Sequence, residues 1–301
     1  MTHLSRIWHV ARAIFKTFRL ALPKIGIGWM FALLTIDFNR IAIVELGIAA
    51  ILITTMLGLH QFLSPFQIII GRIDDRHPIA GLRRTPYVIL ASIIASLVFL
   101  ALPTVVHAMG AGSPLATLTG FVLLIIFGIA TAMFGDSHHA LIAEVTSART
   151  RGGVISVVWT FTILSTILAA IVMNIVRPEY TPEAMQRLYN LTPWIVIGSA
   201  MLGLVGIERR LTGDQLAASI RVAKQSAPAG NPIGVAIHLL HTNPQTRGFF
   251  AFIFVSMFSI FLQDNILEVF GAEVFGVAYD PSAAPDAEAR TRAFFAKHLG
   301  N

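Results

Sequence analysis

The chain has no cysteine among its 301 residues, and charged residues make up only 13% of it. The absence of cysteine excludes disulfide bonds and cysteine-based metal or redox sites. A soluble domain carries about 25% charged residues, so the low charge argues against a soluble protein. The sequence also lacks a nucleophile with a partnered base, a phosphate-binding loop and a cluster of metal ligands. We therefore expect neither an enzyme nor a bound metal ion.

Apolar residues, in contrast, form 55% of the chain and gather in long stretches. A helix needs about 20 mostly apolar residues to cross the hydrocarbon core of a bilayer. Seven stretches approach or exceed this length, and the one over residues 193–207 is the weakest. We predict an all-α membrane protein with spans at residues 24–45, 48–71, 87–107, 115–136, 154–176, 193–207 and 249–270.

Basic residues predict how these spans are oriented. They gather in the N-terminal segment and in the loops after the second, fourth and sixth spans, whereas the loop after the fifth holds only Arg177 and Arg187. Because positive loops stay in the cytoplasm, the N-terminus is expected inside and the chain beyond residue 270 outside. The net charge of +6 then indicates contact with anionic lipid headgroups, not with nucleic acid.

The chain divides into five predicted segments. Residues 3–20 combine apolar residues at helical spacing with basic ones, which predicts a helix lying flat on the cytoplasmic surface; the alternative is an extension of the first span. Pro and Gly residues between the sixth and seventh spans predict a linker. The segments are an amphipathic segment 1–23, a six-helix bundle 24–207, a linker 208–247, a seventh helix 248–270 and a polar tail 271–301.

The loop after the second predicted span reads GRIDDRHPIAGLRRTP. It resembles the signature of the major facilitator superfamily, in which a glycine is followed by an Asp-Arg pair and further basic residues. Asp75 is expected to reach an arginine or a helix N-terminus, and the arginines to face the headgroups. The alternative is an ordinary positive loop in solvent. The matching residues are Gly71, Asp75, Arg76, Arg83 and Arg84.

Two further motifs narrow the resemblance. The first span contains LLTIDFNRIAIVEL and the seventh contains FLQDNILEVFGAEVFG. Together with the Gly-x-Arg-Arg-x-Pro-Tyr run at Gly81–Tyr87, they resemble the PucC-like, or bacteriochlorophyll delivery, branch of that superfamily. Phe38 and Val269 depart from the family pattern, and spans eight to twelve are absent from this sequence. The polar residues of the two motifs are Asp37, Asn39, Arg40, Glu45, Gln263, Asp264 and Glu268.

The resemblance implies the six-helix N-terminal half of a major facilitator plus the first helix of the second half. It also implies a bacterial inner photosynthetic membrane and a role in assembling light-harvesting complexes. Bacteriochlorophyll or chlorophyll would be the cargo, and light-harvesting polypeptides or pigment-synthesis enzymes the partners. Two alternatives remain open: an ion-coupled small-solute transporter that uses Asp37, Arg40 and Asp264, and a purely structural subunit of a photosynthetic complex.

Ionised side chains at bilayer depth need a partner or a polar cavity. Asp37 and Arg40 are three residues apart, so they could pair locally. Arg40 and Asp264 are expected at similar depth, because each follows its span's cytoplasmic start by the same number of residues. A pair between Arg40 and either Asp264 or Glu268 would join the two halves, as a structural lock or as a gate.

Histidine and phenylalanine are the candidates for pigment contact. His60, next to Gln61, is expected near the middle of the second span, where a neutral imidazole could ligate a chlorophyll magnesium or simply bond a neighbouring helix. His138 and His139 are expected in a solvated position at the cytoplasmic end of the fourth span. The phenylalanines near Phe258 would suit lipid, a phytyl tail or a macrocycle.

Overall fold

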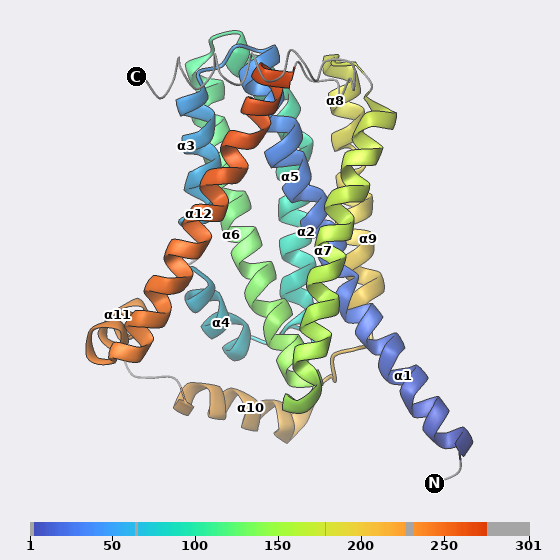
Figure 1. The fold of residues 1–301 in the computed structure, drawn as a ribbon. Helices are drawn as coiled ribbons and strands as arrows, with labels where there is room; N and C mark the ends of the chain where they lie inside the picture. The colour runs from blue at the N-terminus through green and yellow to red at the C-terminus, as the bar shows by residue number, and fades with distance from the viewer. Residues whose placement is uncertain (1–2, 64–65, 178, 227–231, 276–301) are drawn as a thin grey trace.

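A computed structural model describes residues 3–63, 66–177, 179–226 and 232–275, and every regular element in these ranges is helical (Figure 1). This confirms the predicted all-α fold. The first half comprises α1 His3–Ala21, α2 Pro23–Ala32, η1 Leu33–Phe38, η2 Ile41–Glu45, α3 Ala50–Gln61, α4 Phe66–Arg76 and α5 Thr85–Gly110. The second comprises α6 Pro114–Val145, α7 Ala148–Val176, α8 Pro182–Tyr189, α9 Thr192–Leu204, α10 Gly213–Ser226, α11 Pro232–Thr242 and α12 Pro244–Phe275.

Four helical stretches in the described ranges are long and apolar enough to cross a membrane. They are Val10–Glu45, which runs from α1 through η2, and the three helices α5, α6 and α7. α12 is also 32 residues long and runs obliquely along the bundle (Figure 1). Long apolar helices therefore confirm that this is a membrane protein.

Two predicted spans differ from the observed helices. The span expected over residues 48–71 consists of α3 and α4, with a turn at Phe62–Leu63 between them. The sequence has a proline, Pro65, between the two helices; proline lacks an amide N–H and disfavours helical geometry in the residue before it. The span expected over residues 193–207 corresponds to α9, which covers 13 residues and ends at Leu204; the separate helix α8 precedes it, and its buried residues Met185 and Leu188 belong to the same core.

The N-terminal segment is an extension of the first span, the alternative to the expected surface helix. Only Leu22 separates α1 from α2, and Leu20 and Ala21 are buried where α1 packs on α7 and α9. Its basic side chains cap other helices: Lys16 donates to the carbonyl of Val145, and Arg19 donates to those of Leu202 and Val205. Unpaired carbonyls at helix C-termini are favourable sites for such cations.

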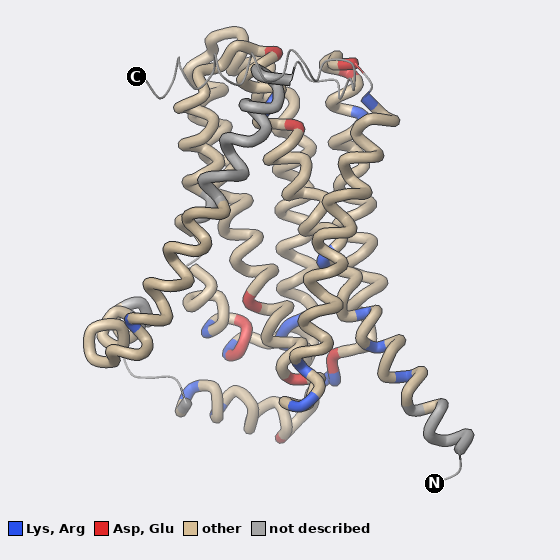
Figure 2. Tube along the Cα trace, viewed as in Figure 1, with Lys and Arg blue, Asp and Glu red and all other residues tan. Residues whose placement is uncertain are grey.

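The stretch expected to be a linker contains two helices, α10 and α11. α10 packs against α4, so this part of the chain is in contact with the bundle. Lys and Arg side chains concentrate at the end of the molecule that carries the α4–α5 loop, the α6–α7 loop and α10, here called the basic end (Figure 2).

Close helix contacts hold the centre of the bundle. α2 lies between α7 and α9, and its glycines allow the approach. A Cβ atom on Gly28 would lie 2.3 Å from the carbonyl oxygen of Thr162 on α7. Small residues at helix interfaces let backbones approach closely in lipid, where apolar burial itself gives little driving force.

Candidate functional site

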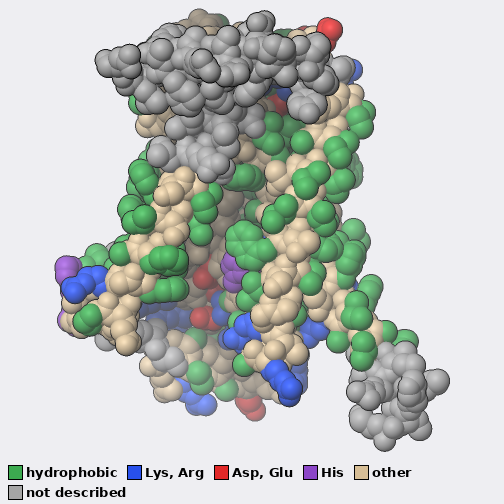
Figure 3. All heavy atoms as spheres, in the orientation of Figure 1, with side chains coloured by type: hydrophobic (Ala, Val, Ile, Leu, Met, Phe, Trp, Pro, Cys, Tyr) green, Lys and Arg blue, Asp and Glu red, His purple; other side chains and the backbone are tan. Residues whose placement is uncertain are grey.

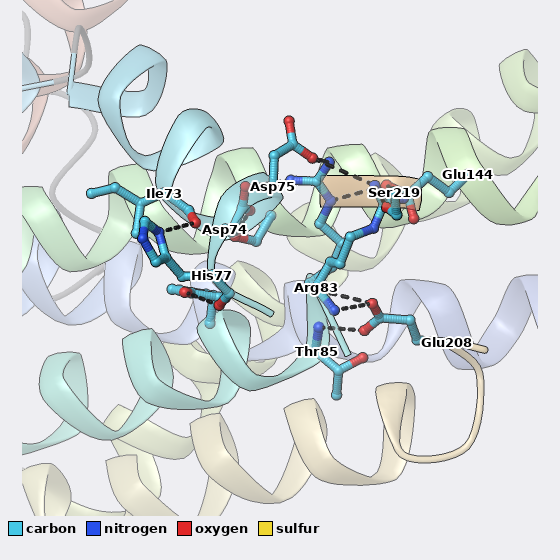
Figure 4. A network of polar contacts seen from close by, with 12 residues as sticks. Ile73, Asp74, Asp75, His77, Arg83, Thr85, Glu144, Glu208 and Ser219 are labelled. Carbon is cyan, nitrogen blue, oxygen red and sulfur yellow. Dashed lines mark hydrogen bonds and ion pairs between the residues drawn. The ribbon is translucent and has the colours of Figure 1, made fainter. Parts of the chain in front are cut away.

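A network of ion pairs lies at the basic end of the bundle (Figure 4). Its centre is Arg84, whose guanidinium contacts Asp74 and Asp75 of α4 and Glu144 of α6. The Nη2–Oδ1 distance to Asp75 is 2.5 Å and the Nε–Oε1 distance to Glu144 is 3.0 Å. Asp74 also accepts a hydrogen bond of 2.7 Å from Ser137 of α6. One cation therefore joins α4, α5 and α6.

Burial sets the protonation of this network. It raises the pKa of the Asp74 carboxyl above its ordinary value, and the contact with Arg84 only partly offsets that effect. Burial also opposes the charge on Arg84, but the hydrogen bond and ion pairs to its acids outweigh it, so the pKa of Arg84 is raised. Arg84 is therefore a permanent cation that needs its carboxylates ionised.

Glu208, just beyond α9, caps the N-terminus of α5. Its carboxylate accepts hydrogen bonds from the backbone N–H groups of Arg83 at 2.6 Å, Arg84 at 3.0 Å and Thr85 at 2.7 Å. These are N–H groups without partners inside the helix, and an anion is favoured there by the helix dipole. The side chain of Arg83 reaches Glu144 and the hydroxyl of Ser219 on α10. The network thus fixes α10 to the bundle.

The loop motif residues are placed as follows. Asp75 reaches arginines, as expected, but Arg83 and Arg84 point into the protein and not toward the headgroups. Gly71 leaves room for Asp136, because a Cβ atom there would lie 3.0 Å from that carboxylate. Sequence reasoning missed Asp74, Glu144 and Glu208. Their only signal is that each is an acid beside a predicted basic loop.

A second polar site lies inside the first span. The motif LLTIDFNRIAIVEL forms two π-helical turns, η1 and η2, with backbone bonds such as Asn39 N–H to the carbonyl of Leu34. Such wide turns are uncommon and are frequent at functional sites. α12 packs against both turns. The two motifs behind the family resemblance therefore occupy adjacent elements.

Asp37 and Arg40 do not pair with each other. Asp37 is buried and accepts a hydrogen bond of 2.5 Å from Arg177, at the end of α7, while Arg40 lies 3.2 Å from Glu45. Arg177 was missed by sequence reasoning, although an arginine directly after a long apolar run was a signal. The side chains of Gln263, Asp264 and Glu268 lie outside the described residues, so the pair between Arg40 and an acid of α12 stays a prediction.

This site contains polar atoms without partners. The Asn39 side chain is 0% exposed, and within the described part of the chain neither its Nδ2 nor its Oδ1 makes a hydrogen bond. Nε of Arg40 and Nε of Arg177 are also buried and have no hydrogen-bond partner among the described residues. An unpartnered polar group in a low-dielectric interior costs free energy, so these atoms mark a place where the fold is not optimised for stability alone.

A hollow lies between α7 and α12 in the space-filling view, with histidine and acidic side chains at its floor (Figure 3). On α6, His139 is exposed and Asp136 is partly exposed. His138 is fully buried instead of solvated, and its Nε2 bonds the carbonyl of Leu20 at 2.9 Å. Among the described residues, no group of three or more His, Asp or Glu side chains could hold a metal ion.

The phenylalanines of α12 form an exposed aromatic ladder. The rings of Phe250 and Phe254 lie 6.3 Å apart, and those of Phe254 and Phe258 lie 6.2 Å apart, both nearly parallel. Phe258 is 59% exposed. The side chains of His60 and Gln61, at the end of α3, lie outside the described residues, so their role stays a prediction.

We predict that Arg84→Ala lowers the free energy of unfolding by about 3–5 kcal/mol, because it leaves buried acids without a counter-charge. Unfolding by SDS in mixed micelles measures it. Arg149→Ala is the matched control, since Arg149 is exposed at the start of α7 and should change stability by less than about 0.5 kcal/mol. Equal effects of the two substitutions would contradict a central role for Arg84.

The pair of Asp37 and Arg177 can be tested by a double-mutant cycle. Arg177→Met alone should lower the free energy of unfolding by about 3 kcal/mol, because it leaves a buried carboxylate unpaired. Adding Asp37→Asn removes that charge and should restore part of the loss. If the double variant is no more stable than Arg177→Met alone, the pair does not stabilise the fold.

Comparison with known proteins agrees with this arrangement. The family model described as PUCC protein matches residues 37–282, which include the polar residues of both intramembrane motifs and the network at the basic end. A protein of Rhodobacter capsulatus named "Bacteriochlorophyll synthase 44.5 kDa chain" is 31% identical over 272 residues, covering 87% of this chain and 58% of its own length. "Protein PucC" of the same organism is 24% identical, covering 86% of this chain and 56% of its own length.

"Protein PucC" of Rhodovulum sulfidophilum is 21% identical, with 87% of this chain and 58% of that protein covered. The chain thus spans between half and two thirds of the length of these relatives. The family model matches well over half of the chain, and the relative at 31% identity covers 87% of it. On these grounds the chain belongs to the PucC protein family.

Proposed function

We propose that this protein is a membrane-embedded assembly factor for photosynthetic light-harvesting complexes, which handles or delivers bacteriochlorophyll or chlorophyll. Family membership and the names of the relatives support a photosynthetic role. The partners in this proposal are light-harvesting polypeptides or pigment-synthesis enzymes. The proposal assigns this chain a handling role and no synthetic step.

The observation that carries the proposal is the aromatic ladder on α12. A chlorophyll has a flat macrocycle and a long apolar tail, and both need a surface that competes with lipid. Phe250, Phe254 and Phe258 present stacked and exposed rings at successive helical turns. Aromatic faces prefer offset stacking with other rings, which aliphatic lipid chains do not offer. The ladder therefore offers a macrocycle stacking contacts that a helix facing only lipid would not need.

Two modes of pigment binding differ in their residues. In the first, the imidazole of His60 ligates magnesium, with Gln61 beside it. In the second, the macrocycle or tail rests on the ladder at Phe258. A His→Leu change at lipid depth is cheap for stability, so substitution separates the modes without unfolding the bundle.

We expect the protein to co-purify with chlorophyll-type pigment, seen in its absorption spectrum. If the magnesium mode holds, His60→Leu lowers the pigment-to-protein ratio several-fold and Phe258→Ala has little effect; the ladder mode reverses this order. Val255→Ala, on the same exposed helix, is the control for a general loss of apolar surface. Absence of pigment in the unaltered protein, purified from a pigment-producing membrane, would contradict the proposed function.

A transporter remains the second candidate, because of the polar site in the first span. Asp37 in η1 pairs with Arg177, and the buried Asn39 directly follows this π-helical turn; buried polar residues of this kind are expected along an ion or solute pathway. Alternating access, however, needs two halves that rock about a central site. A proton-driven solute gradient in vesicles, without bound pigment, would favour this candidate. A purely structural subunit would show neither pigment nor transport.

We further propose that the protein lies in the bacterial photosynthetic inner membrane with its basic end in the cytoplasm. The concentration of Lys and Arg at that end supports this orientation (Figure 2). The opposite end carries the loop between α7 and α8, where Glu179 is exposed.

The absence of native cysteine makes this orientation directly testable. Gln225→Cys, in α10, should be shielded from a membrane-impermeant maleimide added to intact cells, and Glu179→Cys should be labelled. Both sites should react after the cells are opened, which controls for expression and accessibility. Labelling of Gln225→Cys in intact cells would refute the orientation.

A further inference from the structure

Lys24 is a buried cation without an acidic partner in the described part of the chain. It lies near the start of α2 and is 5% exposed. None of the ion pairs between described residues includes it. Its Nζ lies 5.1 Å from the ring centroid of Trp159 on α7. A cation–π contact is favourable, but it offsets only part of the cost of burying a charge.

Two histidines of α6 lie beside Lys24. The carbonyl of Leu20 that His138 bonds lies four residues before Lys24, and the ring centroids of His138 and His139 are 6.0 Å apart. His138 bonds the carbonyl of Leu20 through Nε2, so that nitrogen carries the proton, and its buried Nδ1 has no partner. His139 is exposed. Within the described residues, the buried Lys24 thus has an aromatic contact but no acidic partner, and the buried Nδ1 of His138 has no partner.

The native acids do not fill this gap. Asp136 lies one turn before His139 on α6, but the charges that act on it are those of Asp74, Asp75 and Arg84 at the basic end. Lys24 makes no ion pair with it. Among the described residues, the site therefore has a positive charge and no negative charge paired with it.

The surroundings of the charge indicate an amphipathic ligand. Trp159 is 52% exposed, so much of its indole is free to contact a ring or an apolar body. Charge-assisted hydrogen bonds at such depth are about twice as strong as neutral ones, because they form away from water. A small soluble anion would leave the indole uncovered, and a neutral lipid tail would leave the cation unpaired.

We propose that Lys24 and Trp159 bind the ionised carboxylate of an amphipathic ring compound, with the carboxylate on the ammonium and the ring against the indole. Resting on the proposed pigment function, this ligand class is the free propionate of a bacteriochlorophyllide, which the esterified bacteriochlorophyll lacks. The site then distinguishes the unesterified pigment from the finished one.

The experiment compares ligands that differ only at the carboxylate. The purified full chain in detergent micelles is titrated with bacteriochlorophyllide a, with its methyl ester and with bacteriochlorophyll a, followed by the pigment absorption shift. We expect the free acid to bind about tenfold or more tightly than its methyl ester, the effect of one buried charge-assisted contact. Lys24→Gln should remove this preference and leave binding of the ester unchanged. Lys224→Gln, on the exposed face of α10, is the matched control and should keep the preference.

Equal affinity for the free acid and its methyl ester would overturn the carboxylate site while leaving the pigment function intact. Binding of neither pigment would overturn the pigment function as well. Displacement of the free acid by phosphatidylglycerol at equal concentration would overturn the proposal in favour of a lipid phosphate site. The ligand comparison uses the unaltered protein, so it decides the question even if Lys24→Gln fails to fold.

Discussion

The contact between the guanidinium of Arg84 and the acids of α4 and α6 is the interaction on which the basic end depends. Asp74, Asp75 and Glu144 would repel one another at this distance without a cation between them. Arg84 immediately precedes α5, and Glu208 caps the same helix start from the residues after α9. The start of α5 thus sets the position of α4, α6 and α10 together. The basic loop before α5, which the sequence suggests is a surface loop, therefore connects several helices.

The sequence was sufficient for the membrane class and most of the helices, because apolar length alone determines them. It was insufficient where a helix breaks. Pro65 was readable, but the division into α3 and α4 was not predicted, since the apolar content continues across it. The sequence also did not predict that the side chain of Arg84 points into the protein. Its partners lie 60 residues away at Glu144 and 124 residues away at Glu208, and a local motif carries no information about such distances.

The polar motif of the first span shows a different limit. The sequence singles out Asp37, Asn39 and Arg40, because polar residues at bilayer depth need a partner or a function. The expected local pair of Asp37 with Arg40 assumed regular α-helical spacing. In a π-helical turn, with hydrogen bonds to the fifth residue, residues three apart no longer share a face. Asp37 is therefore free to meet Arg177 on α7, and the departure from regular geometry lies in the segment where the chemistry is concentrated.

The attachment of α10 changes what the chain between the bundle and α12 can do. Because Glu208 and Ser219 bond the start of α5 and Arg83, the beginning of this stretch is fixed to the bundle, and the chain left to connect the bundle with α12 is shorter than residues 208–247. A shorter connection raises the local concentration of what it carries and lowers the entropic cost of closing the loop. α12 and its aromatic ladder therefore stay close to the bundle. A ligand held on one is confined to within reach of the other.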